Sequence, residues 1–423
     1  MKKIIKYLFL LTGGSFILAS CNDFLDREPL DSVTPDNFFF TENDLAAYAV
    51  KHYNFTTHEG FNAGIWKNDN ATDSQAATDY DKKWIPGQWK VPEAYDNPAS
   101  NDPWYFSTIR EANYFLETVV PRFEKGEIEG SETNIKHYIG EMYFLRAKNY
   151  LSKLETFGDF PIIKNTLPDE SESLIQASKR APRYKVAHFI LEDLDQAISL
   201  LTNNISGGKN RITKNAALLL KSRAALFEAS WLTYHKGTAL VPGGPGWPGK
   251  AEDIADFNID TEIAFFLKEA KAAAKEVIGN AALVQNTAKD CMDETVKTDE
   301  DKYKMSNPYF AQFSANSLEG YSEILMWRAY NLLDYKIVHS APFYIRVGGN
   351  TGFTRQYVES FLCRDGKPIY ATDQYKGDES LLNVRKNRDL RLQLFLMTPG
   401  ETLSPNVMNG TPDLLPEVPQ LLD

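Results

Sequence analysis

The chain has 423 residues, a formal net charge of −11, and 43% hydrophobic and 24% charged residues. This length and composition are typical of a globular protein with one large core or two domains. The negative net charge argues against nucleic acid as a partner. It also argues against docking onto anionic lipid through a basic patch.

The first twenty residues have the pattern of a secretory signal. Three lysines among the first six residues precede an apolar stretch from Tyr7 to Leu18. As a helix this stretch would rise about 18 Å, which is too short for a hydrocarbon core of about 30 Å. The pattern therefore predicts a cleaved signal over residues 1–20 rather than a membrane-spanning helix.

The segment Leu18-Ala19-Ser20-Cys21 closes this stretch with the lipobox arrangement of a bacterial lipoprotein. The small side chains before the cysteine suit a peptidase cleft, and Cys21 supplies the thiol for acylation. An ordinary signal peptide with an incidental cysteine is the alternative. Removal of residues 1–20 would leave a charge of −14, so the lipid on Cys21 has to be the membrane anchor.

Residues 21–40 are polar, contain proline and lack a helical period, which predicts a flexible leader. Thr41 is a candidate N-cap for a helix, with Asp44 as its capping-box partner. Residues 56–103 are rich in Gly, Asn, Asp and Pro and hold no period. Long irregular stretches inside a compact domain are usually functional or mobile. This one carries Trp66, Trp84 and Trp89.

The centre of the chain repeats apolar residues at the 3.6-residue spacing of amphipathic helices. The expected helices cover residues 104–120, 135–157, 186–201, 213–229 and 263–278. Gly158 and Pro161 end the second helix, and Thr213 is placed to cap the fourth. The apolar stripe of the fifth helix includes Phe266 and Leu267.

Alanines recur at inward positions of these helices, where helices can approach closely. The pattern predicts a mostly α fold of tetratricopeptide-like helical hairpins over residues 41–300, with long irregular loops. The connections 158–181 and 232–260 are too long for a regular solenoid. Residues 301–423 alternate short apolar patches with Gly and Pro, which predicts a loop-rich C-terminal region with some strand or short helix.

The sequence contains none of the G-x-S-x-G, P-loop, H-E-x-x-H and C-x-x-C signatures. Two carboxylates that meet in space would still suit a glycosidase, which is the enzymatic alternative. Asp69 and Asp73 offer oxygen ligands for calcium but lack EF-hand spacing, so a solvated loop without a cofactor is favoured. Cys291 and Cys363 could pair in an oxidising compartment, but their spacing favours separate small apolar residues.

Aromatic residues make up 13% of the chain, and their flat faces either pack in a helical core or stack on sugar rings. Trp247 lies in a segment rich in Pro and Gly, residues 242–249, which predicts an exposed loop. The candidate ligand-binding residues are the loop tryptophans Trp66, Trp84, Trp89 and Trp247. The tryptophans in helical or apolar settings, Trp104, Trp231 and Trp327, are predicted to belong to the core.

Several segments, in this order, resemble the SusD/RagB family of surface lipoproteins from Bacteroidota. They are Cys21-Asn22-Asp23-Phe24-Leu25-Asp26, Arg110 to Leu116, Glu141 to Ala147 followed by Phe157-Gly158-Asp159-Phe160-Pro161, Ile190 to Leu194, Val358-Glu359-Ser360-Phe361 with Asp365-Gly366-Lys367, and Asn387 to Leu392. Family members usually continue beyond the last motif into another helix-bearing stretch. We therefore expect a truncated or shortened member with an incomplete C-terminal region.

The resemblance implies a non-enzymatic nutrient receptor that is lipid-anchored in the outer membrane and faces outward. Such a protein caps a SusC-like TonB-dependent transporter and delivers an oligosaccharide or polysaccharide to it. A peptide ligand is the alternative within the family, and a scaffold that binds only the transporter is a further one. The resemblance assigns a role to one residue of this chain, Cys21 as the lipidated residue, because no fixed set of binding residues defines the family.

Overall fold

The computed structural model describes residues 38–53, 69–78, 85, 104–285, 307–313, 315–330, 333 and 351–399, and the backbone of 402–404 and 413–414. Within these residues the fold is mostly helical, as predicted. The longer helices are α3 (Glu42–Lys51), α4 (Ser107–Glu124), α5 (Glu132–Phe157), α7 (Arg183–Leu200), α8 (Lys214–Tyr234) and α9 (Ile259–Asn280). The shorter helices are α6 (Ser171–Ala177), α11 (Pro308–Ala311), α13 (Arg355–Ser360), α14 (Leu381–Arg385) and α15 (Leu390–Phe395).

The strands are short and pair segments that are separated in the sequence. β1 (Gln75–Ala77) runs antiparallel to β2 (Thr351–Phe353), with Gln75 opposite Phe353. β3 (Thr402–Ser404) runs antiparallel to β4 (Asp413–Leu414). Three turns of 3₁₀ helix, η3 (Gly208–Asn210), η4 (Ala251–Ile254) and η5 (Ile369–Ala371), lie in connections.

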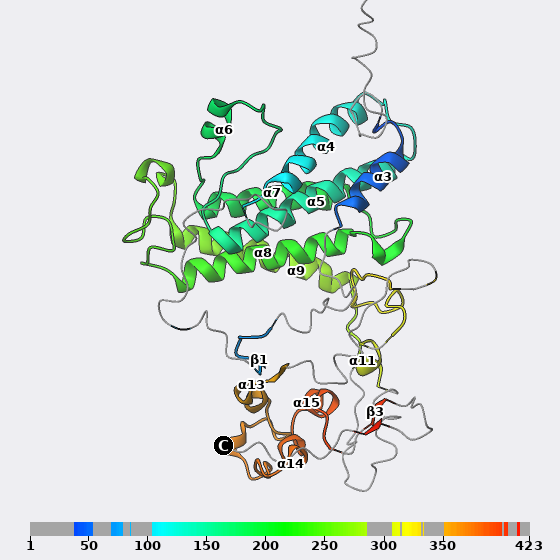
Figure 1. Ribbon diagram of the computed structural model, residues 1–423, viewed down its shortest axis with the longest axis vertical. Coiled ribbons are helices and arrows are strands. Elements are labelled where there is room, and N and C mark those ends of the chain that lie inside the picture. The colour runs from blue at the N-terminus through cyan, green and yellow to red at the C-terminus, as the bar shows by residue number, and fades with distance from the viewer. Residues whose placement is uncertain are drawn as a thin grey trace, which may run out of the picture.

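Helices α3 to α9 form a layered array, in which α5 packs against α3, α4 and α7, and α8 packs against α7 and α9 (Figure 1). The short helices α13, α14 and α15 lie with β1 in a second group, away from this array in the same view. The array matches the tetratricopeptide-like stacking that the sequence predicts. Among the described residues, no helix combines the length and the apolar character needed to cross a bilayer.

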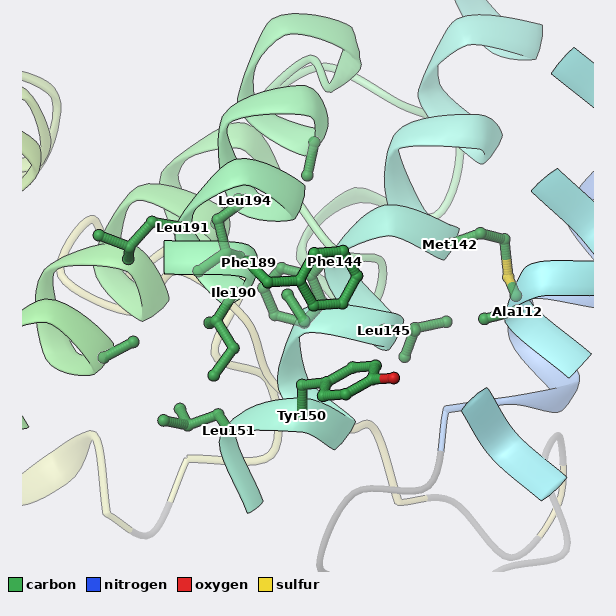
Figure 2. Close-up of a cluster of buried hydrophobic side chains, with 14 of the residues drawn as sticks. Ala112, Met142, Phe144, Leu145, Tyr150, Leu151, Phe189, Ile190, Leu191 and Leu194 are labelled. Carbon is green, nitrogen blue, oxygen red and sulfur yellow. The ribbon is translucent and has the colours of Figure 1, made fainter. Parts of the chain in front are cut away.

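Helix α5 is buried on two sides and forms the centre of the main apolar core. Figure 2 shows Met142 of α5 near Ala112 of α4, while α7 contributes Phe189 and Ile190 on another side of α5. Burial of a side chain as large as Met142, Phe189 or Ile190 stabilises the folded state by about 1.5–3 kcal/mol. The 3.6-residue spacing of apolar residues in the sequence is sufficient to predict that these side chains face the core.

A buried ion pair joins three helices of this core. Arg146 of α5 donates from Nε and Nη2 to the two carboxylate oxygens of Asp193 on α7, at 2.7 Å in each case. Its Nη1 donates to Oδ1 of Asn113 on α4 at 2.8 Å, and Asn113 in turn donates to the carbonyl oxygen of Ile163. Burial raises the pKa of Asp193, and the Arg146 guanidinium acts in the opposite direction. The complete hydrogen bonding of the pair offsets its desolvation.

The predicted helix ends are largely confirmed. Thr41 and Asp44 form the expected capping box at the start of α3. The hydroxyl of Thr213 accepts a hydrogen bond from the Ala216 amide and caps α8. Gly158 ends α5 with a φ of +70°, a conformation that glycine adopts without steric cost.

Two expectations about the helices were wrong. Helix α4 begins at Ser107 and runs past the expected end to Glu124, with Pro121 inside its last turn. Leu267 is 46% exposed rather than inward-facing, since α9 packs mainly on α8, with contacts to His188 of α7 near its start, and buries a narrower stripe. The connection 158–181 contains α6, a helix with no buried residue.

Replacing Arg146 with leucine is expected to lower the free energy of unfolding by about 3–5 kcal/mol, because Asp193 would stay buried without its guanidinium. Denaturant unfolding followed by circular dichroism measures this loss. Lys236→Met is the matched control: Lys236 and Asp260 form a 2.6 Å pair at the surface, and loss of such a pair costs below about 1 kcal/mol. Equal losses in the two variants would contradict the prediction.

Candidate functional site

The corner between α5 and α7, residues 157–161, positions the loop tryptophan Trp247. Gly158 starts this corner, and a Cβ at this glycine would lie 3.1 Å from Nη1 of Arg183. Both its left-handed φ and this close approach therefore favour glycine. The next residue, Asp159, turns its carboxylate toward the start of α7 and toward the loop after α8.

The Asp159 carboxylate accepts two hydrogen bonds from distant parts of the chain. Oδ1 accepts from the backbone N–H of Arg183 at 2.8 Å, and Oδ2 accepts from Nε1 of Trp247 at 2.8 Å. Burial raises the pKa of Asp159, although both hydrogen bonds and the nearby Arg183 and Arg180 guanidiniums lower it. One carboxylate thus ties the loop of Trp247 to the first turn of α7.

A second buried ion pair lies beside this carboxylate. Nη2 of Arg183 donates to Glu228 of α8 at 2.7 Å, and Nε donates to the same carboxylate at 2.9 Å. The guanidinium also lies over the ring of Trp231, 4.3 Å from its centroid. Trp231 donates from Nε1 to the carbonyl oxygen of Leu240. The ends of α7 and α8 and the beginning of the next loop are therefore held together.

The loop of Trp247 is built from successive tight turns. The amide of Gly244 donates to the Val241 carbonyl, and the amide of Trp247 donates to the Gly244 carbonyl. A Cβ at Gly244 would lie 1.8 Å from the Thr238 carbonyl oxygen, so the turn has room only for glycine. The Trp247 ring lies so close to Gly249 that a Cβ there would clash with it.

Trp247 is half-buried, and its indole N–H is already used by Asp159. The part of the ring that remains exposed can contact the apolar face of a ligand but cannot also donate a hydrogen bond from Nε1. Near the same corner, Trp104 packs on Phe157 and Phe160, with the Arg180 guanidinium 4.8 Å from a Trp104 ring centroid. The corner thus has tryptophans on more than one of its sides.

The tryptophans that were predicted to belong to the core lie at its edges. Trp104, Trp231 and Trp327 are each half-buried. The Trp327 side chain donates to Glu319 at 3.0 Å, and its backbone N–H donates to the Lys209 carbonyl. Trp327 therefore fastens residues 315–330 to the connection between α7 and α8, which the apolar pattern of the sequence did not indicate.

Several predicted site residues lie outside the described residues: Cys21, Trp66, Trp84, Trp89 and Cys291. Cys363 is a free, buried thiol whose pKa is raised by burial. The carboxylates of Asp69 and Asp73 are exposed in the bend before β1. In the part of the chain that the structure describes, no group of three acidic, His or Cys side chains gathers to hold a metal, and calcium at Asp69 and Asp73 stays a prediction.

A SusD-like family model, described as "Starch-binding associating with outer membrane", matches residues 23–226, which include α3 to α7 and part of α8. Two similar proteins from Formosa agariphila are the SusD-like protein P38, 27% identical over 203 residues, and the SusD-like protein P2, 26% identical over 258 residues. Over these residues the chain is similar to the SusD-like family. The matched residues include both Arg146 and Asp193, so this buried pair lies in the matched segment, whereas Glu228 and Trp247 lie beyond it.

Solved structures of SusD-like proteins share the fold. A SusD-like protein from Bacteroides fragilis superposes with a TM-score of 0.55 at 20% identity, covering 87% of this chain and 63% of the other. A SusD-like carbohydrate-binding protein from the same species gives 0.50 at 16% identity, covering 84% and 60%. The alignments to P38 and P2 cover 47% and 59% of this chain but 37% and 45% of those relatives, so the matched part spans less than half of their length.

In this SusD-like chain, Asp159→Ala is expected to loosen the loop of Trp247, because the Trp247 indole and the Arg183 amide lose their acceptor. Hydrogen bonds to a charged acceptor contribute about 1.5–3 kcal/mol, so amide exchange at Gly244 and Trp247 should quicken by about tenfold or more. Hydrogen–deuterium exchange with mass spectrometry measures the change. Asp169→Ala, at an exposed acid in the same connection, is the control, and similar exchange in both variants would refute the role of Asp159.

Proposed function

We propose that this protein is a glycan-binding lipoprotein of the outer membrane that delivers oligosaccharides to a SusC-like TonB-dependent transporter. The observation that carries the proposal is the match of residues 23–226 to a family described as starch-binding and associated with the outer membrane. One fold relative is itself named a carbohydrate-binding protein, which supports the same ligand class. In this proposal the protein binds and passes on its ligand without catalysing a reaction.

The geometry of the helical array is compatible with a receptor. Buried ion pairs fix the helices, and the loop of Trp247 is held to the array by Asp159. A half-buried indole with a fixed orientation loses little conformational entropy when a sugar ring stacks on it. The acidic chain gives no electrostatic reason to bind anionic polymers. A neutral glycan is therefore the ligand class that these features favour.

The proposed anchor is the lipid on Cys21, and the proposed location is the outward-facing side of the outer membrane. Cys21→Ser is expected to abolish incorporation of labelled palmitate in cells and to release the protein from the membrane fraction, because acylation requires the thiol. Cys363→Ser is the control, since that thiol is buried in the fold. Persistent labelling of Cys21→Ser would show that the lipobox assignment is wrong.

Binding is tested with the full chain in affinity gels and by calorimetric titration against a panel of neutral polysaccharides. Trp247→Ala is expected to weaken binding by about two- to tenfold, since an aromatic contact contributes about 0.5–1.5 kcal/mol beyond area burial. Trp247→Phe keeps a ring and should retain most of the affinity. Absence of binding to every glycan, with binding to peptides instead, would replace the glycan proposal by the peptide one.

Two other outcomes would overturn the receptor proposal. Release of reducing ends by the purified protein would identify a glycoside hydrolase. Unchanged uptake after alanine substitution of Trp84, Trp89 and Trp247 together, with the transporter still bound, would favour a structural scaffold. Each outcome is distinct from a folding defect, provided that circular dichroism shows an intact helical array.

A further inference from the structure

A row of three aromatic side chains runs from the end of β2 through α13 to the residue after it, away from the corner at Trp247. Phe353, Tyr357 and Phe361 follow one another at four-residue intervals, with ring centroids 5.4 Å and 5.2 Å apart. Phe353 is 49% exposed, and the other two are half-buried. We call these three residues the aromatic row. It belongs to the group of short helices that Figure 1 shows apart from the array.

The aromatic row is held rigidly at both ends. The Thr354 hydroxyl accepts from the Tyr357 amide and caps α13, while the Thr354 amide donates to the Ser74 carbonyl next to the β1–β2 pair. At the other end, the buried Arg388 donates from Nη2 to the carbonyls of Val358 and Phe361, at 2.7 Å each. Aromatic side chains on a fixed backbone are preorganised for binding.

Charged groups border the row, and they are paired with one another. Arg355 donates to Glu359 and to Asp378 at 2.6 Å each. Arg391 lies over the Phe361 ring at 5.9 Å and pairs with Asp389 at 2.6 Å. Arg355 and Arg391 have carboxylate partners, and together with the buried Arg388 the three guanidiniums are matched by the three carboxylates of Glu359, Asp378 and Asp389, so this border has no surplus positive charge. It can exchange hydrogen bonds with hydroxyl groups but does not favour an anionic ligand.

The orientation of the rings also bears on the ligand. Phe353 and Tyr357 are tilted by 58°, and Tyr357 and Phe361 by 77°, so the row is not one flat apolar face. A chain of sugar rings that turns from one unit to the next can place an apolar face on one aromatic ring and hydroxyls toward the charged border.

We propose that the aromatic row is a binding site for a neutral pyranose oligosaccharide, separate from the corner at Trp247. This inference rests on the proposed glycan-binding function and adds a second contact region in the C-terminal part of the chain. A glycan held by both regions would bind more tightly than one held by either alone, because the second contact becomes intramolecular.

The test uses the full chain in affinity gels with soluble starch, laminarin and galactomannan, and polygalacturonate as the anionic probe. The double variant Phe353→Ala with Tyr357→Ala is expected to weaken binding of at least one neutral glycan by about tenfold. Because the Phe353 ring is half-exposed, Phe353→Ala alone should leave folding intact. It should weaken glycan binding less than the double variant does. Tyr370→Ala is the control, at a tyrosine that is 88% exposed on η5, and should bind like the unmodified chain.

The outcomes separate the inference from the function on which it rests. If the unmodified chain binds a neutral glycan and the row variants bind it equally well, the inference is wrong and the proposed function stands. If the unmodified chain binds no glycan, both fail. Stronger binding of polygalacturonate that depends on the row, or loss of transporter binding with intact glycan binding, would also overturn the neutral-glycan assignment.

Discussion

The buried pair of Arg146 and Asp193 is the interaction on which the helical array depends. Apolar packing alone favours burial of α5 but specifies its position along α4 and α7 only loosely, because apolar contacts are non-directional. A bidentate guanidinium–carboxylate pair permits one relative placement of α5 and α7, and the added bond to Asn113 extends this constraint to α4. We infer that the register of the central helices is set by this polar joint.

Similar arginine–carboxylate pairs join other elements of the array. Arg183 joins α7 to Glu228 of α8, and Arg211 joins the connection before α8 to Glu141 of α5. Asp159 then uses its carboxylate to fasten the loop of Trp247 to the array. Loops that would otherwise be mobile are thereby fixed at one point to a rigid scaffold, which is how binding residues on loops gain precision.

The two aromatic regions differ in how they are supported, and this bears on binding. Trp247 belongs to a glycine-rich loop that hydrogen bonds from Trp247 to Asp159 and from Trp231 to Leu240 tie to the array, whereas the aromatic row spans the end of β2 and the capped helix α13. Opening of the loop would break the hydrogen bonds to Asp159 and Leu240 and expose the buried Val241, while α13 is fastened at its end by the fully buried Arg388. Both aromatic regions are therefore presented on backbone that buried groups hold in place.

The sequence by itself determined the helices, their caps and most inward positions, because the 3.6-residue period, Thr41, Thr213 and Gly158 act locally. The resemblance to the SusD/RagB family, too, followed from local motifs read in order. Only the tertiary structure decided that Asp159 holds Trp247, that Leu267 faces outward, and that Phe353 and Phe361 line up with Tyr357 of α13. These features depend on which side chains meet across tens or hundreds of residues and on which helix face a neighbour covers, and periodicity carries no information about either.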